Sequence, residues 1–274
     1  MQQPIEVCVI IPAYNRVNTI SRAIDSVLAQ TRPPKEIIVV DDGSTDATSE
    51  AVKMYENVIL LRQKNMGVSA ARNNGVMMAE SEWIAFLDSD DVWMPQKLEK
   101  QMDFHQKNPT CKVSYTNESW IRNGLHVNMP KKFQKSWGDL YERSLNECLI
   151  APSSVMIQRK LFDDMGGFDE SLEVCEDYDL WLRIMKHHEF GLIDEALIIK
   201  YGGHDDQLST RHWGMDRFRL QSLEALHRRY PNDKILLHVM IKKYRVLYEG
   251  ALKYERHEEA FHYAWRIEEL EKVL

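Results

Sequence analysis

The sequence predicts an α/β domain built on a mainly parallel sheet flanked by helices. Four unbroken apolar runs are typical of strands covered on both faces, at residues 7–11, 37–40, 58–61 and 83–87. Helical signals separate them: apolar residues recur every three or four positions over 20–28, and 67–79 is rich in alanine. Because strand and helix alternate in this way, we expect βαβ units.

The second half of the chain has a looser pattern. Residues 112–119 and 121–127 predict a β-hairpin whose turn is Asn123-Gly124. A further strand is expected at 154–157, and residues 129–139 are expected to form a loop over a cleft. A helix should begin near Glu176, and the chain becomes strongly helical from about residue 213.

Composition excludes several classes of protein. The 274 residues are 44% hydrophobic, enough for a sizeable core, and 42 acidic against 35 basic residues give a net charge of −7. This balance argues against a nucleic-acid partner, which needs a concentrated basic surface. The four cysteines are far apart and form no zinc pattern, and a disulfide framework has little support. With no charged leader and no apolar run of about 20 residues, we expect a cytoplasmic protein without a transmembrane segment.

Carboxylates follow two of the predicted strands. Asp41-Asp42 follows the second strand and Asp88-Ser89-Asp90-Asp91 the fourth. Ligands of open parallel sheets bind outside the carboxyl ends of the strands, where such acidic tips would repel each other unless a cation compensated. A hard divalent ion that bridges carboxylates and a diphosphate is one interpretation. The alternative is that these residues are ordinary turn and helix-capping residues.

Four more positions have both a functional and a structural interpretation. Asp177, beside Glu176 at a helix start, could be a general base, or both acids could simply complement the helix dipole. Arg72 is either a ligand contact or a solvated helix residue. His204, in a glycine-containing stretch, is a metal or phosphate contact or a turn residue. Tyr14, after the first strand, stacks on a base or packs internally.

Four motifs, in order, resemble those of family 2 inverting glycosyltransferases. They are Pro12-Ala13-Tyr14-Asn15-Arg16, Val40-Asp41-Asp42-Gly43-Ser44-Thr45-Asp46, Asp88-Ser89-Asp90-Asp91 and Glu176-Asp177-Tyr178-Asp179-Leu180-Trp181. The resemblance covers roughly residues 5–210 and implies the GT-A fold, a Rossmann-like, mainly parallel sheet. We expect a glycosyltransferase domain over 1–212, with a nucleotide-binding half (1–110) and an acceptor-binding half (111–212), then a helical extension over 213–274.

The resemblance also implies roles for the matching residues. Asp177 would be the catalytic base, and a divalent metal, Mn²⁺ or Mg²⁺, would be bound by Asp90, Asp88 and His204. The residues assigned to the nucleotide are Pro12, Ala13, Tyr14, Arg16, Asp41, Asp42, Arg72, Asp88 and Ser89.

The activity implied is transfer of one sugar from a nucleotide-diphospho-sugar such as a UDP-sugar, with inversion at the sugar carbon. The acceptor would be a carbohydrate, a lipid-linked glycan or a glycoprotein, in surface polysaccharide or glycoconjugate biosynthesis. The Q-x-x-R-W motif and membrane helices of processive relatives are not found, which favours single-sugar transfer. The C-terminal helices would shape the acceptor site, form a homodimer or brace the sheet, and peripheral association with the inner face of the membrane fits such acceptors.

The sequence leaves two rival functions open. A sugar nucleotidyltransferase shares an α/β fold and an acidic metal site, but it usually has a glycine-rich, basic loop after the first strand. This chain has Pro12-Ala13-Tyr14-Asn15-Arg16 there. The other rival is a nucleotide-sugar-binding or scaffold protein, in which Asp177 would have no catalytic role.

Overall fold

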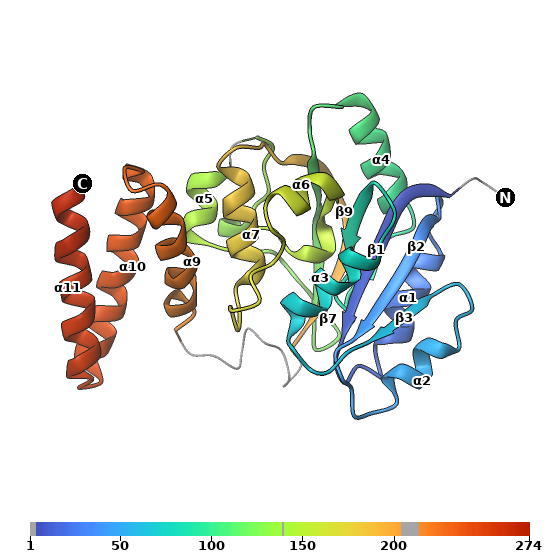
Figure 1. Cartoon of the computed structure of the whole chain (residues 1–274), viewed down its shortest axis with the longest axis horizontal. Helices are drawn as coiled ribbons and strands as arrows, with labels where there is room; N and C mark the ends of the chain where they lie inside the picture. The colour runs from blue at the N-terminus through green and yellow to red at the C-terminus, as the bar shows by residue number, and fades with distance from the viewer. Residues whose placement is uncertain (1–3, 139, 204–213) are drawn as a thin grey trace.

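The computed structural model describes residues 4–138, 140–203 and 214–274. Within these residues a nine-stranded sheet has the order β3-β2-β1-β4-β8-β6-β9-β5, with β7 paired to β6, and helices surround it (Figure 1). The strands are β1 (Ile5–Ala13), β2 (Pro34–Asp41), β3 (Ile59–Arg62), β4 (Trp83–Phe86), β5 (Val92–Trp93), β6 (Val113–Arg122), β7 (Leu125–Val127), β8 (Met156–Gln158) and β9 (Gly191–Gly202). The helices are α1 (Ile20–Leu28), α2 (Thr48–Lys53), α3 (Val68–Met78), α4 (Lys97–Lys107), α5 (Tyr141–Asn146), α6 (Arg159–Asp164), α7 (Glu176–Met185), α9 (Asp216–Arg229), α10 (Lys234–Lys253) and α11 (His257–Val273).

The amino-terminal part of the sheet is parallel, as the sequence predicts. Strand β1 pairs in parallel with both β2 and β4, and β2 pairs in parallel with β3. Strand β8 is antiparallel to β4 and to β6, whereas β6 and β9 run parallel. Parallel neighbours need a crossover connection, and α1, α2 and α3 supply these crossovers.

Strand β1 is covered by a hydrophobic core on each face. Val9 and Ile11 pack in a cluster with Ile24 of α1, and Cys8 and Ile10 pack in a second cluster that includes residues of α3 and α7. Each of these side chains is fully buried, and burying an aliphatic side chain contributes about 1.5–3 kcal/mol. Two covered faces explain why the run from residue 7 to 11 is apolar throughout rather than alternating.

Helix α3 packs on β1 at a glycine. A Cβ atom on Gly75 would lie 2.5 Å from Cγ2 of Ile10 and 3.1 Å from Cγ2 of Val40, which is closer than van der Waals contact. The helix therefore approaches the sheet only because position 75 has no side chain. This close approach also fixes how far from the sheet Arg72 lies, because Arg72 is about one turn earlier in the same helix.

The predicted hairpin is confirmed, with longer pairing on its first strand. Asn123 and Gly124 both have positive φ, 49° and 76°, as a two-residue turn that matches the strand twist requires. Ile121 and Arg122 belong to β6, not to its partner, because Arg122 pairs with Leu125. The segment predicted as a loop contains a 3₁₀ turn over Lys131–Phe133.

Sequence patterns did not indicate four of the elements, namely β5, β9, α5 and α6, of which β9 is the longest. Its 12 residues include the charged run Asp194-Glu195 and are exposed there, so they show no sustained alternation. Its pairing with β6 shifts register on both sides of Asn117. Helices α5 and α6 have six residues each, too short for a helical period to be evident.

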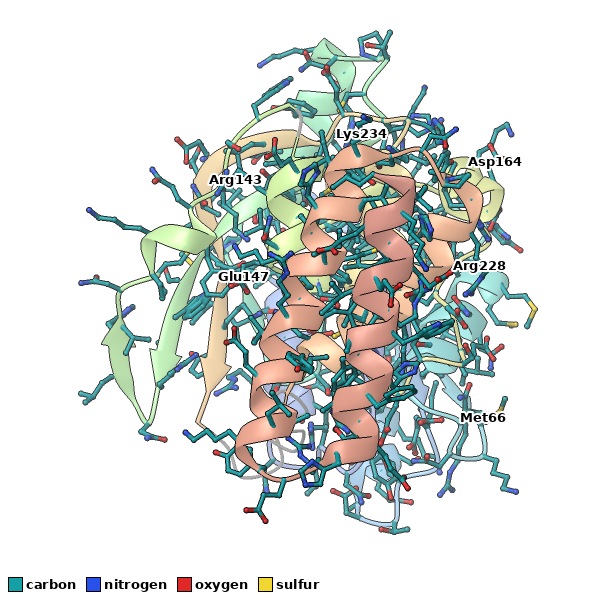
Figure 2. All side chains as sticks on the ribbon, turned by 90° about the vertical axis from the view of Figure 1, so that its left-hand side faces the viewer. Met66, Arg143, Glu147, Asp164, Arg228 and Lys234 are labelled. Carbon is teal, nitrogen blue, oxygen red and sulfur yellow. The ribbon has the colours of Figure 1, made fainter. Side chains whose placement is uncertain are left out.

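The predicted helical extension consists of α9, α10 and α11 and packs at one end of the sheet domain. Figure 2 shows α10 and α11 side by side on this face, and Leu237 of α10 belongs to the same core cluster as Trp181 of α7. Asp233 accepts hydrogen bonds from Tyr141 at 2.5 Å and from Lys186 at 2.6 Å. These contacts attach the extension to the sheet domain, and its predicted dimerisation stays a prediction.

A search of the described residues finds no helix with the length and apolar character needed to cross a membrane. All four cysteines are free thiols.

The Gly75 contact predicts opposite effects for two helical glycines. Gly75→Ala should lower the free energy of unfolding by about 1–3 kcal/mol through overpacking against Ile10. Gly250→Ala in α10 is the control, since a Cβ there meets nothing within 4 Å and should raise stability by roughly 0.5–1 kcal/mol. Urea unfolding measures both changes, and a stabilised Gly75→Ala variant would contradict the packing described.

Candidate active site

The predicted acidic strand ends meet at one edge of the sheet. Ala13 at the end of β1 pairs with Asp41 at the end of β2, and Leu87, just after β4, donates its backbone N–H to Ile10 of β1 at 3.0 Å. Strand β1 lies between β2 and β4, so the loops after all three strands open on the same side. Because the chain order reverses around β1, this edge is a topological switch point, where such sheets bind ligands.

The loop after β1 is fixed to the loop after β2. Asn15 has a positive φ of 52°; its backbone N–H donates to Ser44 Oγ at 2.9 Å, and its side-chain oxygen accepts from Thr45 N–H at 2.8 Å. Arg16 N–H donates to Thr48 Oγ1 at 2.7 Å. These bonds leave Tyr14 45% exposed, with its ring accessible for stacking.

Pro12 and Ala13 are buried at the end of β1. Their predicted contact with the nucleotide, like that of Arg16, stays a prediction.

The two aspartates after β2 are held by protein donors. Asp41 has no exposed surface and accepts hydrogen bonds from Ser44 N–H at 2.8 Å and from the Ser49 hydroxyl. Asp42 is 4% exposed and accepts from Met66 N–H at 2.8 Å and Gly67 N–H at 2.9 Å. In this conformation both carboxylates hold the loops in place, in keeping with their interpretation as turn residues. A nucleotide could reach Asp41 only after loop movement, and the predicted contacts stay predictions.

The Asp88–Asp91 segment alternates between partly exposed and buried residues. Asp88 and Asp90 are partly exposed, whereas Ser89 and Asp91 are buried. Ser153 fixes the turn: its hydroxyl donates to Asp91 Oδ2 at 2.7 Å and accepts from Asp88 N–H at 3.0 Å. Burial raises the pKa of Asp91 well above its usual value, although the positive charge of Lys200 opposes this shift. The structure thus leaves Asp88 and Asp90 as the carboxylates near solvent.

Arg72 lies beneath this segment and connects it to α7. Arg72 is 3% exposed, and its guanidinium donates to Asp88 Oδ1 at 2.7 Å and to Glu176 Oε1 at 2.6 Å. Burial disfavours the charge, but Asp88 and Glu176 outweigh this effect and raise the pKa of Arg72. Both interpretations from the sequence placed Arg72 at a surface, facing either nucleotide or solvent. The structure shows instead a buried cation between two carboxylates, and its predicted nucleotide contact stays a prediction.

Asp177 lies at the start of α7, where Cys175 has a left-handed backbone with φ of 67°. Asp177 Oδ1 accepts from Tyr178 N–H at 2.7 Å, and Oδ2 accepts from the Cys148 thiol at 3.3 Å. Burial, followed by the charge of Glu176, raises the pKa of Asp177 to about 6, while Arg72 opposes the shift. A carboxylate with a pKa near 6 is ionised at neutral pH and basic enough to accept a proton.

The donor set fits a hard divalent cation that is completed by a substrate. Asp88 and Asp90, two positions apart, provide carboxylate oxygens, which Mg²⁺ and Mn²⁺ prefer. The described residues contain no cluster of three acidic, histidine or cysteine side chains that could hold a metal unaided. Mg²⁺ is usually bound by one or two carboxylates together with substrate phosphates. His204, the third predicted ligand, lies outside the described residues.

Lys200 of β9 is a candidate site residue that the sequence did not indicate. It is half-buried, and the charges of Glu118, Asp91, Asp88 and Asp177 raise its pKa against the effect of burial. Its positive charge therefore interacts with carboxylates of the Asp88–Asp91 segment and with the candidate base Asp177. Lys200 belongs to none of the sequence motifs. It could have been identified only if β9 had been predicted as a strand that pairs with β6.

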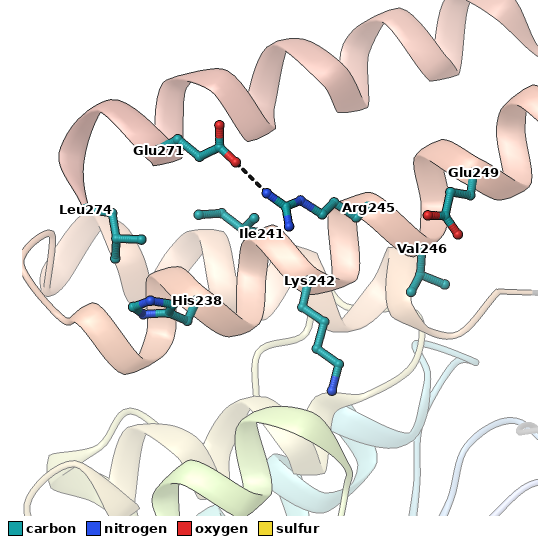
Figure 3. Close-up of a pocket in the computed structure, with 8 residues that line it drawn as sticks. All are labelled: His238, Ile241, Lys242, Arg245, Val246, Glu249, Glu271 and Leu274. Atoms are coloured by element: carbon teal, nitrogen blue, oxygen red, sulfur yellow. Dashed lines mark hydrogen bonds and ion pairs between the residues drawn. The ribbon is translucent and has the colours of Figure 1, made fainter.

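A cavity of about 330 Å³ lies away from this edge, between α10 and α11. Figure 3 shows its lining, with Arg245 and Glu271 joined by an ion pair of 2.7 Å. None of the strand-end residues described above lines it. It does not belong to the candidate active site.

Removing Arg72 should cost far more stability than removing an exposed arginine. Arg72→Met leaves Glu176 and Asp88 facing each other without their shared cation and should lower the free energy of unfolding by about 3–5 kcal/mol. Arg245→Met is the control, because its pair with Glu271 is exposed and should contribute about 0–1 kcal/mol. Urea denaturation compares the two, and equal losses would contradict the role of Arg72.

The sequence matches a family model and several named proteins. The model, described as glycosyl transferase family 2, matches residues 8–166. The chain is 30% identical over 231 residues to Bacillus subtilis TuaG, a protein named for teichuronic acid biosynthesis, covering 81% of this chain and 89% of TuaG. It is 35% identical over 195 residues to Escherichia coli WfgD, named as a UDP-Glc:α-D-GlcNAc-diphosphoundecaprenol β-1,3-glucosyltransferase, covering 70% and 74% of the two chains. The chain spans 28% to 66% of the length of four relatives from Rickettsia species.

The fold matches solved structures at lower identity. A structure of S. aureus TarS residues 1–349 in complex with UDP-GlcNAc superposes with a TM-score of 0.70 and 21% identity, covering 86% of this chain and 71% of that one. At this identity the likeness supports the fold alone. It confirms the GT-A architecture expected from the motifs, and the family match confirms the resemblance. The chain belongs to glycosyl transferase family 2.

Proposed function

We propose that this chain is an inverting, metal-dependent, non-processive glycosyltransferase that moves one sugar from a UDP-sugar to an acceptor hydroxyl. The observation that carries the proposal is the connection from Asp88 through Arg72 to Glu176, beside Asp177. This connection joins Asp88, which with Asp90 would hold a metal–diphosphate group, to the helix start that carries Asp177, whose pKa is about 6. The two groups match the two needs of glycosyl transfer, stabilising a departing diphosphate and accepting a proton.

The donor is assigned to the half of the chain that carries the strand-end loops, residues 1–110. Tyr14 would stack on the base, and Asp42 would shape the loop around it. UDP is supported as the nucleotide by the UDP-GlcNAc complex of TarS and by the UDP-Glc donor in the name of WfgD. Asp88, Asp90 and His204 would hold the divalent cation, which, when bound, neutralises charge on the diphosphate.

The acceptor is assigned to residues 111–212, where Asp177 lies. The acceptor oxygen attacks the anomeric carbon from the face opposite the diphosphate, the bond from that carbon to the phosphate oxygen breaks, and the hydroxyl proton passes to the Asp177 carboxylate. Arg72 keeps Glu176 paired during this step, so the adjacent base is the carboxylate left to take the proton.

The names of two relatives support the proposed acceptor class. WfgD is named for a lipid-linked acceptor and TuaG for a cell-wall polymer, so we assign this chain to surface polysaccharide or glycoconjugate biosynthesis. Work on a lipid-linked acceptor would place the protein in the cytoplasm at the inner face of the membrane. The extension over 213–274 would brace the acceptor half through its shared core.

Asp177→Asn should abolish transfer while leaving donor binding intact. UDP release from UDP-glucose or UDP-GlcNAc should fall by at least ~100-fold, since an amide cannot accept the proton. The wild-type rate should also fall as pH drops through about 6, where Asp177 takes up a proton. Calorimetry should show unchanged UDP affinity in Asp177→Asn. This result would show that the variant has lost the base and not the donor site.

Exposed Asp103 of α4 provides a matched control, because Asp103→Asn should change neither quantity. Since the pKa of Asp177 is raised in the folded state, its ionisation opposes folding at neutral pH, and Asp177→Asn should unfold at the same or a higher temperature than wild type. Wild-type turnover by Asp177→Asn would eliminate this residue as the base. Pyrophosphate release from UTP and a sugar 1-phosphate would instead support a nucleotidyltransferase.

Removal of divalent metal should abolish both activity and tight UDP binding. EDTA would remove the cation that Asp88 and Asp90 would hold, so the acidic edge would then repel the nucleotide. A thermal-shift titration with UDP in the presence of Mn²⁺, of Mg²⁺ or of EDTA measures the effect, because bound ligand raises the melting temperature. Asp90→Asn should reduce the Mn²⁺-dependent part of the shift, and an undiminished UDP shift in EDTA would refute the metal role.

A further inference from the structure

The thiol of Cys148 lies against the candidate base from a different part of the chain. Cys148 follows α5, 29 positions before Asp177 in the sequence, and its Sγ is 3.3 Å from Asp177 Oδ2. The side chain is half-buried. Neither the sequence motifs nor the mechanism proposed above gives this cysteine a role.

Cys148 can act only as a donor in this contact. Burial, with the negative charge of Asp177, raises the pKa of the Cys148 thiol well above its ordinary value, so the S–H proton is retained at neutral pH. The single proton has two acceptors within reach, Asp177 Oδ2 at 3.3 Å and the Ile150 carbonyl at 3.8 Å. The carboxylate oxygen is nearer and carries charge, which makes it the stronger acceptor.

Two donors therefore hold the two oxygens of the Asp177 carboxylate. Tyr178 N–H binds Oδ1 at 2.7 Å and the Cys148 thiol binds Oδ2 at 3.3 Å. With one donor on each oxygen, rotation of the carboxylate about its bond to Cβ would break a hydrogen bond. A carboxylate oxygen has a second lone pair, so each oxygen can still accept a proton from a substrate.

Charged groups from several elements also face this carboxylate. Glu176 of α7 raises the pKa of Asp177, and Arg72 of α3 lowers it. The negative charge of Asp177 in turn raises the pKa of Lys200 of β9. Arg219 of α9 faces the thiols of Cys148 and Cys175. Among the hydrogen bonds to the side chain of Asp177, Cys148 supplies the donor from outside α7.

We propose that Cys148 is a positioning residue that orients the Asp177 carboxylate and favours its ionised form by donating its S–H to Oδ2. The proposal rests on the proposed function, in which Asp177 is the base. The contact itself is a property of the protein without substrate and can be tested independently of activity.

The test is the pKa of Asp177 measured by NMR on protein labelled with ¹³C at the aspartate carboxyl carbons. Asp177→Asn identifies the signal. Cys148→Ala removes a donor to the ionised form and should raise this pKa by ~0.4–1 unit. Cys148→Ser restores a donor and should return the pKa toward the wild-type value. An identical Asp177 pKa in wild type, Cys148→Ala and Cys148→Ser would overturn the proposal.

Cys111→Ala is the matched control, because the Cys111 thiol donates to the Val113 carbonyl at 3.2 Å and is outside the site. It should leave the pKa of Asp177 unchanged. The acid limb of the pH–rate profile for UDP release should move with the NMR pKa in the Cys148 variants. Wild-type turnover by Asp177→Asn would remove the base assignment but would leave the NMR result on the contact standing.

A reciprocal measurement does not require Cys148→Ala to fold. Asp177→Asn removes the negative charge beside the thiol, so the pKa of Cys148 should fall and its alkylation by iodoacetamide at pH 8–9 should become several-fold faster. Cys111 in the same protein serves as the internal reference. Equal alkylation rates of Cys148 in wild type and Asp177→Asn would count against the contact.

Discussion

The candidate active-site edge depends on one buried interaction, the pairing of Arg72 with Asp88 and Glu176. Helix α3 positions the Arg72 guanidinium, because this helix approaches β1 closely at Gly75. The guanidinium then binds a carboxylate after β4 and another at the start of α7, segments separated by 88 positions from Asp88 to Glu176. A buried cation with two anionic partners keeps its charge, whereas either carboxylate alone would be costly to bury. The two halves of the site are thereby held in one fixed relation.

Environment gives chemically identical carboxylates different properties along this edge. Asp91 is buried, and burial raises its pKa. It stabilises the turn by accepting a hydrogen bond from the Ser153 hydroxyl. Asp88 is paired with Arg72, and both Asp88 and Asp90 are partly exposed. Asp177 has a pKa of about 6, which suits a proton acceptor at neutral pH. The positive charge of Lys200 among these groups limits their mutual repulsion before any cation or nucleotide binds.

Much of the fold could be predicted because its signals are local. Unbroken apolar runs identify the buried parallel strands, and Asn123-Gly124 identifies the hairpin turn. The acidic strand ends were predicted to share an edge, and the pairing of β1 with β2 and β4 explains why they do. Long-range features could not be predicted in this way. The burial of Arg72 depends on partners 16 and 104 positions away, and β9 has a charged, exposed segment that breaks the strand pattern.

Glu176 and Asp177 are adjacent in the sequence but have different surroundings: Glu176 is paired with Arg72, and Asp177 is the candidate base. Neighbouring residues of a helix point in directions about 100° apart, so Glu176 can face Arg72 while Asp177 faces Cys148. The left-handed backbone of Cys175 sets where the helix begins and hence both directions. Two unpaired adjacent carboxylates would each resist ionisation. Burial and the charge of Glu176 raise the pKa of Asp177, but because Arg72 opposes them the pKa rises only to about 6. The Asp177 carboxylate therefore remains ionised at neutral pH.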